Sequence, residues 1–131
     1  MKLRNSLRTV ATAGLVLSAV AVGAGPASAA EKDGWLNEGE LGLFCWQDQS
    51  NSVFDLYEID INFYNDNFKG TRSCAGQLTD NNTESWSNRD TYTWKVYTGS
   101  GGQGYMTTLG SGGRGNLNST FFNQITSAFW H

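Results

Sequence analysis

The sequence predicts an all-β domain, a sandwich of short antiparallel strands arranged as two Greek-key motifs. Three observations support this fold class. No segment after residue 30 carries a sustained helical period. Segments rich in aromatic and β-branched residues recur instead. Turn-forming clusters separate them at intervals of about eight to twelve residues, as in residues 98–104 and 110–116.

The first 29 residues read as a secretory signal peptide. A positively charged start is followed by an apolar run over residues 10–22 and by the cleavage pattern Ala27-Ser28-Ala29. The alternative is a membrane anchor, but the run is too short to span about 30 Å of hydrocarbon. We therefore expect a secreted, extracellular protein with one domain over residues 30–131 and no stable membrane insertion after signal removal.

The charge of the mature chain limits its partners. The signal contains three basic residues and no acidic one, so six basic and twelve acidic residues remain, a net charge of −6. An acidic surface disfavours nucleic acid and anionic lipid as partners. It is compatible with calcium and with neutral or basic protein surfaces.

Both cysteines, Cys45 and Cys74, lie in the mature chain. Two cysteines in an exported protein are expected to form one disulfide, with two free thiols as the alternative. Closing this loop should contribute about 3–4 kcal/mol to stability in the chain-entropy model.

The strand candidates follow one another along the mature chain. In the segment 91–97 the residues alternate, which places Tyr92, Trp94 and Val96 on one face. The other candidates are residues 41–46, 53–64, 105–109 and 119–130.

A weak internal repeat divides the mature chain into two halves. In each half an aromatic residue is followed, seven positions later, by a residue suited to positive φ: Phe44 by Asn51, and Tyr97 by Gly104. A polar run ending in Ser comes later in each half, at residues 81–85 and 123–127. Two copies of a hairpin and a polar connection are typical of paired Greek keys.

Three stretches carry a family resemblance: "GWLNEGELGLF", "NNTESW" and "GNLNSTFFNQITSAF". With them the chain resembles the βγ-crystallin superfamily, and within it the secreted bacterial peptidase inhibitors of the streptomycete metalloproteinase inhibitor type. This resemblance implies inhibition of an extracellular protease. The chain departs from the βγ-crystallin hairpin signature, since Gln49 and Gly102 stand at its second aromatic position and Asn51 at its first glycine position. The protease-blocking loop of the type inhibitor has no recognisable counterpart.

The same resemblance implies weak calcium binding by the two polar runs, at about 10⁻⁴–10⁻³ M. The implied ligands come from both runs, so that each site draws on both repeats: side-chain oxygens of Asn82 and Gln124, carbonyls of Thr83 and Ile125, and hydroxyls of Ser85 and Ser127. The alternative is that these residues only stabilise their own loops by hydrogen bonds.

Residues 67–77 are the best candidate for a protease-binding loop, because they are polar, contain glycine and include Cys74. The expected protease contacts are Thr71, Arg72, Ser73, Cys74, Ala75 and Gly76. The alternative is a long inter-strand loop, stapled for stability alone.

The sequence does not predict an enzyme. The single histidine is the terminal His131, where a general base or zinc ligand is not expected. The acidic pair Glu58 and Asp60 alternates with Ile59 and Ile61, which predicts a solvated strand face opposite a core face.

Five tryptophans could form a sugar platform, but in a small β domain they more often fill the core. Trp35 and Trp130 are the two expected to be exposed. We therefore expect a monomeric, non-enzymatic binding protein. A calcium-stabilised cell-envelope or killer-toxin-like module is the first alternative, and a small carbohydrate-active enzyme is the second.

Overall fold

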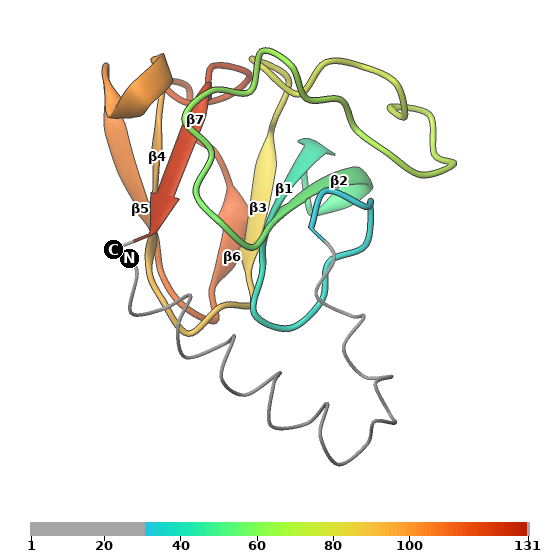
Figure 1. Ribbon diagram of the computed structural model, residues 1–131, viewed down its shortest axis with the longest axis horizontal. Helices are drawn as coiled ribbons and strands as arrows, with labels where there is room; N and C mark the ends of the chain where they lie inside the picture. The colour runs from blue at the N-terminus through green and yellow to red at the C-terminus, as the bar shows by residue number, and fades with distance from the viewer. Residues whose placement is uncertain (1–30, 131) are drawn as a thin grey trace, which may run out of the picture. The chain divides into compact units, whose positions relative to one another are not determined.

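The computed structural model describes residues 31–130, so the predicted signal peptide and His131 lie outside the described residues. Among the described residues no helix is both long and apolar enough to cross a membrane. The described residues form antiparallel strands and one short 3-10 helix (Figure 1). These elements are β1 (Leu41–Trp46), β2 (Ser50–Leu56), β3 (Ser85–Asn88), β4 (Trp94–Tyr97), η2 (Ser100–Gly102), β5 (Met106–Leu109), β6 (Arg114–Asn116) and β7 (Ser127–Trp130).

The strands make two sheets, with orders β2-β1-β3-β6 and β5-β4-β7. In each half of the chain, the hairpin and the last strand lie in one sheet. The segment that crosses over between them pairs with the other sheet. In the second half that segment is β6, which pairs with β3. In the first half it is the segment around Asp60, which bridges to Ala128 of β7 and appears in green beside the red strand in Figure 1. The two predicted Greek keys are therefore confirmed, and they exchange their crossover segments.

The core lies between the two sheets. Trp94 and Val96 of β4 are fully buried, and Tyr92 packs against the same core, as the alternation predicted. The largest fully buried apolar side chains also include Leu41, Leu43, Phe54, Leu56, Phe63, Phe68, Leu109 and Ile125. Because each sheet contains a segment of the other key, neither key encloses this core alone.

The predicted alternation of the segment 58–61 holds for Ile59, which packs against the core, and is wrong for Asp60 and Ile61. Asp60 is only 9 % exposed, whereas Ile61 is 56 % exposed. The cause is register, because Asp60 pairs with Ala128 and Ala128 pairs with Val96, so all three side chains belong to the inner face. Lys32 compensates the buried carboxylate with an ion pair of 3.0 Å.

The prediction for the exposed tryptophans was half right. Trp35 is 73 % exposed, but Trp130 is only 3 % exposed. In β7 the residue Trp130 pairs with Trp94 on the inner face, and its ring stacks on Tyr92 with centroids 5.6 Å apart. Trp130 is therefore a core residue of β7, although only one residue follows it in the sequence.

The strand bounds differ from the predicted segments where local sequence is a weak guide. Segment 53–64 becomes β2 followed by the crossover, and segment 119–130 contributes only β7. β3 and β6 were not predicted, since their short segments SWSN and RGN contain polar residues and glycine. They are strands because β3 lies between β1 and β6 and finds partners on both sides.

The two hairpins have matching backbone conformations. Asn51 and Gly104 both adopt positive φ, 69° and 84°, as the internal repeat predicted. Two further positions match as well: Asp48 and Gln49 in the first hairpin, Gly101 and Gly102 in the second, all with positive φ. The second hairpin has glycine at all three positions, while the first has residues that tolerate this conformation less well.

Candidate functional site

The polar runs of the two halves are neighbours. The Asn81 N–H donates to the Ile125 carbonyl at 3.1 Å, and the Asn123 N–H donates to the Thr83 carbonyl at 2.8 Å. Asn81 and Asn123 hold equivalent places in the two runs, and both have positive φ. The bonds are therefore related by an approximate two-fold symmetry, and the implied calcium-binding corners lie side by side.

Each run ends in a serine that fastens the hairpin of its own half. The Ser85 hydroxyl donates to the Trp46 carbonyl at 2.6 Å and accepts the Gln49 N–H at 2.8 Å. The Ser127 hydroxyl does the same with the Gly99 carbonyl at 2.7 Å and the Gly102 N–H at 3.1 Å. Both serines are fully buried, so their first role is structural. One acceptor lone pair remains on each oxygen.

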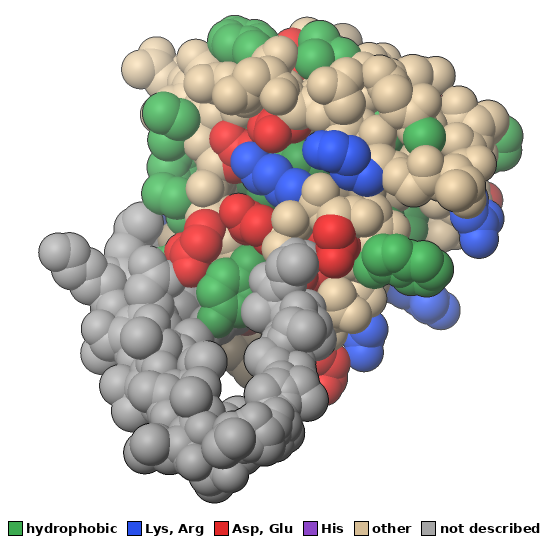
Figure 2. All heavy atoms as spheres, turned by 45° about the vertical axis from the view of Figure 1, so that its right-hand side comes forward, with side chains coloured by type: hydrophobic (Ala, Val, Ile, Leu, Met, Phe, Trp, Pro, Cys, Tyr) green, Lys and Arg blue, Asp and Glu red, His purple; other side chains and the backbone are tan. Residues whose placement is uncertain are grey.

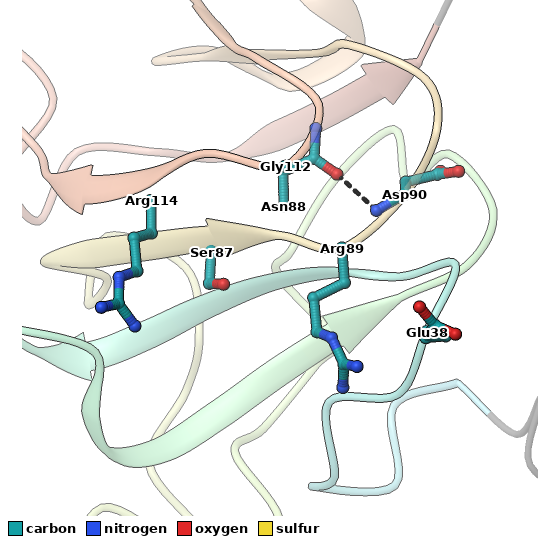
Figure 3. Close-up of a pocket in the computed structure, with 7 residues that line it drawn as sticks. All are labelled: Glu38, Ser87, Asn88, Arg89, Asp90, Gly112 and Arg114. Carbon is teal, nitrogen blue, oxygen red and sulfur yellow. Dashed lines mark hydrogen bonds between the residues drawn. The ribbon is translucent and has the colours of Figure 1, made fainter.

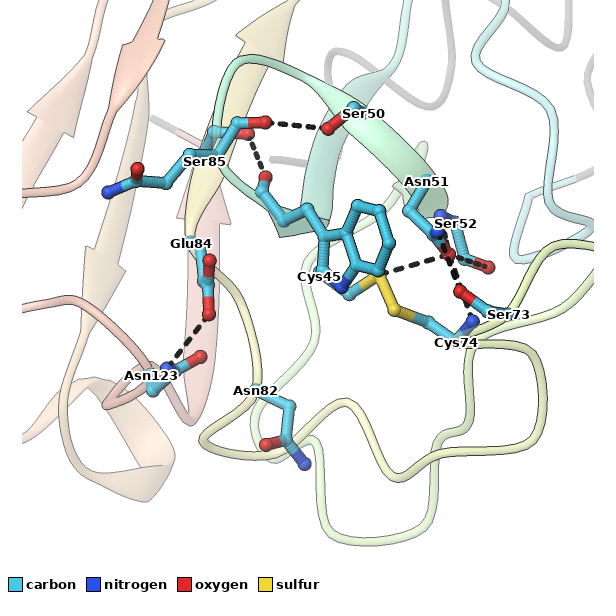
Figure 4. Close-up of a disulfide and its surroundings, with 12 residues drawn as sticks. Cys45, Ser50, Asn51, Ser52, Ser73, Cys74, Asn82, Glu84, Ser85 and Asn123 are labelled. Carbon is cyan, nitrogen blue, oxygen red and sulfur yellow. Dashed lines mark hydrogen bonds between the residues drawn. A yellow bond between two sulfur atoms is a disulfide. The ribbon is translucent and has the colours of Figure 1, made fainter.

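The remaining implied calcium ligands differ in availability. The Asn82 side-chain N–H donates to the Leu78 carbonyl at 2.8 Å. The side-chain oxygen of Asn82, which is labelled in Figure 4, takes no part in this bond and is available as a ligand. Gln124 is exposed. The Thr83 and Ile125 carbonyls each accept one backbone hydrogen bond and keep a second lone pair.

The structure adds oxygens to the first run that sequence reasoning missed. Asp80 Oδ1 and Thr83 Oγ1 are buried and have no hydrogen-bond partner. The Glu84 carboxylate is half-buried and accepts from the Asn123 side chain at 3.1 Å. The first run therefore combines two carboxylates with spare oxygens, the donor set that Ca²⁺ prefers. Asp80, directly before the run, was the available sequence signal. The corresponding positions of the second run carry no acidic residue.

The disulfide Cys45–Cys74 is present and ties the loop after the first crossover to β1 (Figure 4). Asn51 reinforces it: its side-chain oxygen accepts the Cys74 N–H at 2.9 Å, and its amide donates to the Ser73 hydroxyl at 2.8 Å. Asn51 thus serves both as a positive-φ residue of the hairpin and as a clamp on the loop.

The loop has further internal support at its base. Phe68 N–H donates to the Gln77 carbonyl at 2.9 Å, and Gly76 N–H donates to the Phe68 carbonyl at 2.8 Å. Asn67 pairs with Leu78 in an isolated β-bridge. Of the six expected protease contacts, Thr71, Arg72, Ser73 and Gly76 are exposed, Ala75 is half-buried and Cys74 is buried. Cys74 therefore holds the loop and offers no side chain to a partner.

Acidic side chains gather around a few basic ones on the face shown in Figure 2. Lys32 pairs with Asp60 at 3.0 Å and with Asp66 at 3.2 Å. Burial raises the pKa of Asp60 to about 6, assisted by its hydrogen bond to Asp66 and opposed by Lys32. Burial likewise raises the pKa of Asp55 to about 6, although the N–H groups of Gly34 and Asp33 oppose the shift.

Glu40 is the most perturbed of the acids. Its side chain is fully buried; Oε1 accepts the Asn37 N–H at 2.8 Å, and Oε2 has no partner. Burial raises the pKa of Glu40 to about 8, with a further contribution from nearby acids, first among them Asp55. Within residues 31–130 no group of three His, Cys, Asp or Glu side chains is placed to hold a metal ion.

A shallow pocket of about 500 Å³ lies on the outer face of the four-stranded sheet. Arg89 and Arg114 project into it on either side of Ser87 (Figure 3). Glu38 and Asp90 also line it, so its charges balance.

No protein-family model matches the sequence, and no curated protein is significantly similar to it. Solved structures do match. One, from a study of the evolution of the eye lens βγ-crystallin domain fold, has a TM-score of 0.57 at 11 % identity and covers 72 % of this chain and 86 % of its own. A βγ-crystallin from Ciona intestinalis has a TM-score of 0.55 at 14 % identity, covering 71 % and 100 %. The N-terminal domain of protein S has a TM-score of 0.52 at 14 % identity, covering 70 % and 94 %.

At such identities the likeness shows the fold alone. The chain has the βγ-crystallin fold, as its sequence predicted. The finer resemblance to a peptidase-inhibitor family is not shown by these comparisons.

Proposed function

We propose that this βγ-crystallin-fold protein is a secreted, non-enzymatic inhibitor of an extracellular peptidase, and that it acts through the loop of residues 67–77. The observation that carries the proposal is the combination of exposure and restraint in this loop. Thr71, Arg72 and Ser73 are exposed, whereas the residues on both sides of them are fixed.

Restraint matters because a peptidase cleaves flexible segments and is blocked by rigid ones. Tight inhibition at a standard interface depends on preorganisation more than on area. Here the disulfide, the Asn51 clamp and the hydrogen bonds between Phe68 and Gln77 fix the base of the loop before any partner binds. The family resemblance of the sequence points to a metallopeptidase as the target class.

Inhibition assays with the purified mature protein test this proposal. We expect inhibition of a thermolysin-like metallopeptidase at micromolar concentration or below. Arg72→Ala should weaken inhibition at least about tenfold, because truncating a central Arg contact costs about 2 kcal/mol or more and each 1.4 kcal/mol is about tenfold. Arg114→Ala, which changes another exposed arginine, on β6, serves as the matched control and should leave inhibition unchanged. Absence of inhibition at micromolar concentration contradicts the proposal for this enzyme class.

We propose calcium binding at the first polar run as a second function, because Asp80 Oδ1 and Thr83 Oγ1 are buried there without partners. Asp80, Asn82, Thr83 and Ser85 would hold the ion together with the Ile125 carbonyl, and the ion would stabilise the junction of the two keys. The proposed calcium ion would be structural and would take part in no reaction.

Thermal unfolding with calcium and with chelator tests this second function. Calcium at ten times its dissociation constant stabilises the native state by about 1.4 kcal/mol, which raises the melting temperature by about 5–10 °C. Asp80→Asn should abolish this shift, whereas Asp48→Asn, an exposed acid in the first hairpin, should preserve it. Equal melting temperatures in millimolar calcium and in chelator would exclude the site.

A further inference from the structure

A groove of about 530 Å³ lies between the N-terminal residues of the described chain and the proposed protease-binding loop, with which it shares residues 69–72. Three segments form it: the N-terminal residues 34–36, residues 49–53 of the first hairpin and residues 69–72 of the loop. Phe44, from the outer face of β1, also lines it. Gly34 lies close to the backbone of Lys69: a Cβ added to Gly34 would lie 3.2 Å from the Lys69 carbonyl carbon, so the first and third segments are neighbours.

The charge of this groove is opposite to that of the protein. Lys69 and Arg72 line it, and none of the described residues that line it is acidic. The mature chain contains twelve acidic residues, so a groove with two cations and no carboxylate is a local exception. The pocket with Arg89 and Arg114 lacks this property, since Glu38 and Asp90 balance it.

Trp35 provides a flat apolar surface in the same groove. Its side chain is 73 % exposed, the most exposed large hydrophobic side chain among the described residues. Its backbone is nevertheless held, since the Trp35 N–H donates to Asp33 Oδ1 at 2.9 Å and the preceding Gly34 N–H donates to Asp55 Oδ1 at 2.8 Å. An indole presented to solvent from a fixed backbone is suited to stack on a planar or ring-shaped ligand.

We propose that this groove binds an oligosaccharide that carries carboxylate groups. A sugar ring stacks on Trp35, and its acidic group pairs with Lys69 and Arg72. A sugar hydroxyl donates to Ser50 Oγ, whose own proton goes to the Gln47 carbonyl. A ligand with spaced charges suits the site better than a dense polyanion, because the net charge of −6 repels the latter. This binding requires no inhibition of a peptidase. Arg72 belongs to both proposed sites, whereas Trp35 and Lys69 lie outside the expected protease contacts and therefore separate the two proposals.

Isothermal titration calorimetry of the mature protein tests the proposal with four probes. Two are anionic glycans, a hyaluronan octasaccharide and an alginate hexasaccharide; the others are the neutral chitohexaose and a hexaglutamate peptide. We expect binding to at least one anionic glycan, at least about tenfold tighter than to either other probe, and weaker at high salt because exposed charges are screened. Lack of binding to both anionic glycans overturns the proposal. So does equal affinity for hexaglutamate, which would indicate an acidic-peptide site.

Variants locate the binding. Trp35→Ala and Lys69→Gln should each raise the dissociation constant about tenfold or more, the equivalent of losing one central contact. Trp46→Ala and Lys95→Gln are the matched controls, because Trp46 is also an exposed tryptophan, Lys95 lies on β4 of the other sheet, and neither side chain lines the groove. Melting temperatures of all four variants establish that they are folded. Binding that is unaffected in folded Trp35→Ala would overturn the assignment to this groove.

Discussion

Glu40 should make the protein lose stability as the pH rises from acid to neutral. Its folded-state pKa is about 8 because the side chain is buried, against 4.5 in the unfolded chain. A carboxyl group whose pKa is raised on folding favours the folded state only while protonated. Its contribution is fully present below about pH 4.5 and is lost as the pH rises through about 8.

The size of the effect follows from the shift in pKa. Each unit corresponds to about 1.4 kcal/mol, so the loss approaches about 5 kcal/mol above pH 8 and is about 3 kcal/mol at pH 7. Glu40→Gln keeps the acceptor for the Asn37 N–H and cannot ionise. We therefore expect this variant to be more stable than the parent by about 3 kcal/mol at pH 7 and to lose most of the advantage at pH 4.

Urea denaturation between pH 4 and pH 9 measures this difference directly. Glu38→Gln, at an exposed position two residues away, is the matched control and should change stability by less than about 0.5 kcal/mol at any pH. If Glu40→Gln has the same pH dependence as the parent, or is less stable at pH 8, the buried carboxylate is not the source of the instability.

Three further predictions concern the contacts that join the two keys and the loop. Replacing Cys45 and Cys74 together by alanine should cost about 3–4 kcal/mol in urea denaturation, and a cost below 1 kcal/mol would mean that the loop is held mainly by its hydrogen bonds. Ser85→Ala and Ser127→Ala should each cost about 2–3 kcal/mol and match within about 1 kcal/mol, because each hydroxyl makes the same two bonds in its hairpin; very unequal melting temperatures would contradict the symmetry. Asn51→Ala should be less stable than Asn51→Gly by about 1 kcal/mol, since both lose the clamp but only glycine adopts the positive φ freely; equal calorimetric stabilities would disprove this reasoning.

The sequence predicted features that repeat locally. Alternation placed Trp94 and Val96 in the core, and the spacing from an aromatic residue to a positive-φ residue identified Asn51 and Gly104 as equivalent. These inferences held because alternation and backbone conformation depend on a few adjacent residues. The pairing of Cys45 with Cys74 was also predictable, because the sequence has no third cysteine.

Tertiary pairing decided the rest. Asp60 and Ile61 exchanged their expected environments because a single bridge to Ala128 sets which face Asp60 takes, and nothing local to residues 53–64 encodes that partner. Trp130 is buried for the same reason, through its pairing with Trp94. The positive groove beside Trp35 likewise joins three segments that are distant in the chain. Side-chain burial in a sandwich depends on which strands pair and in what register, and those partners come from both halves of the sequence.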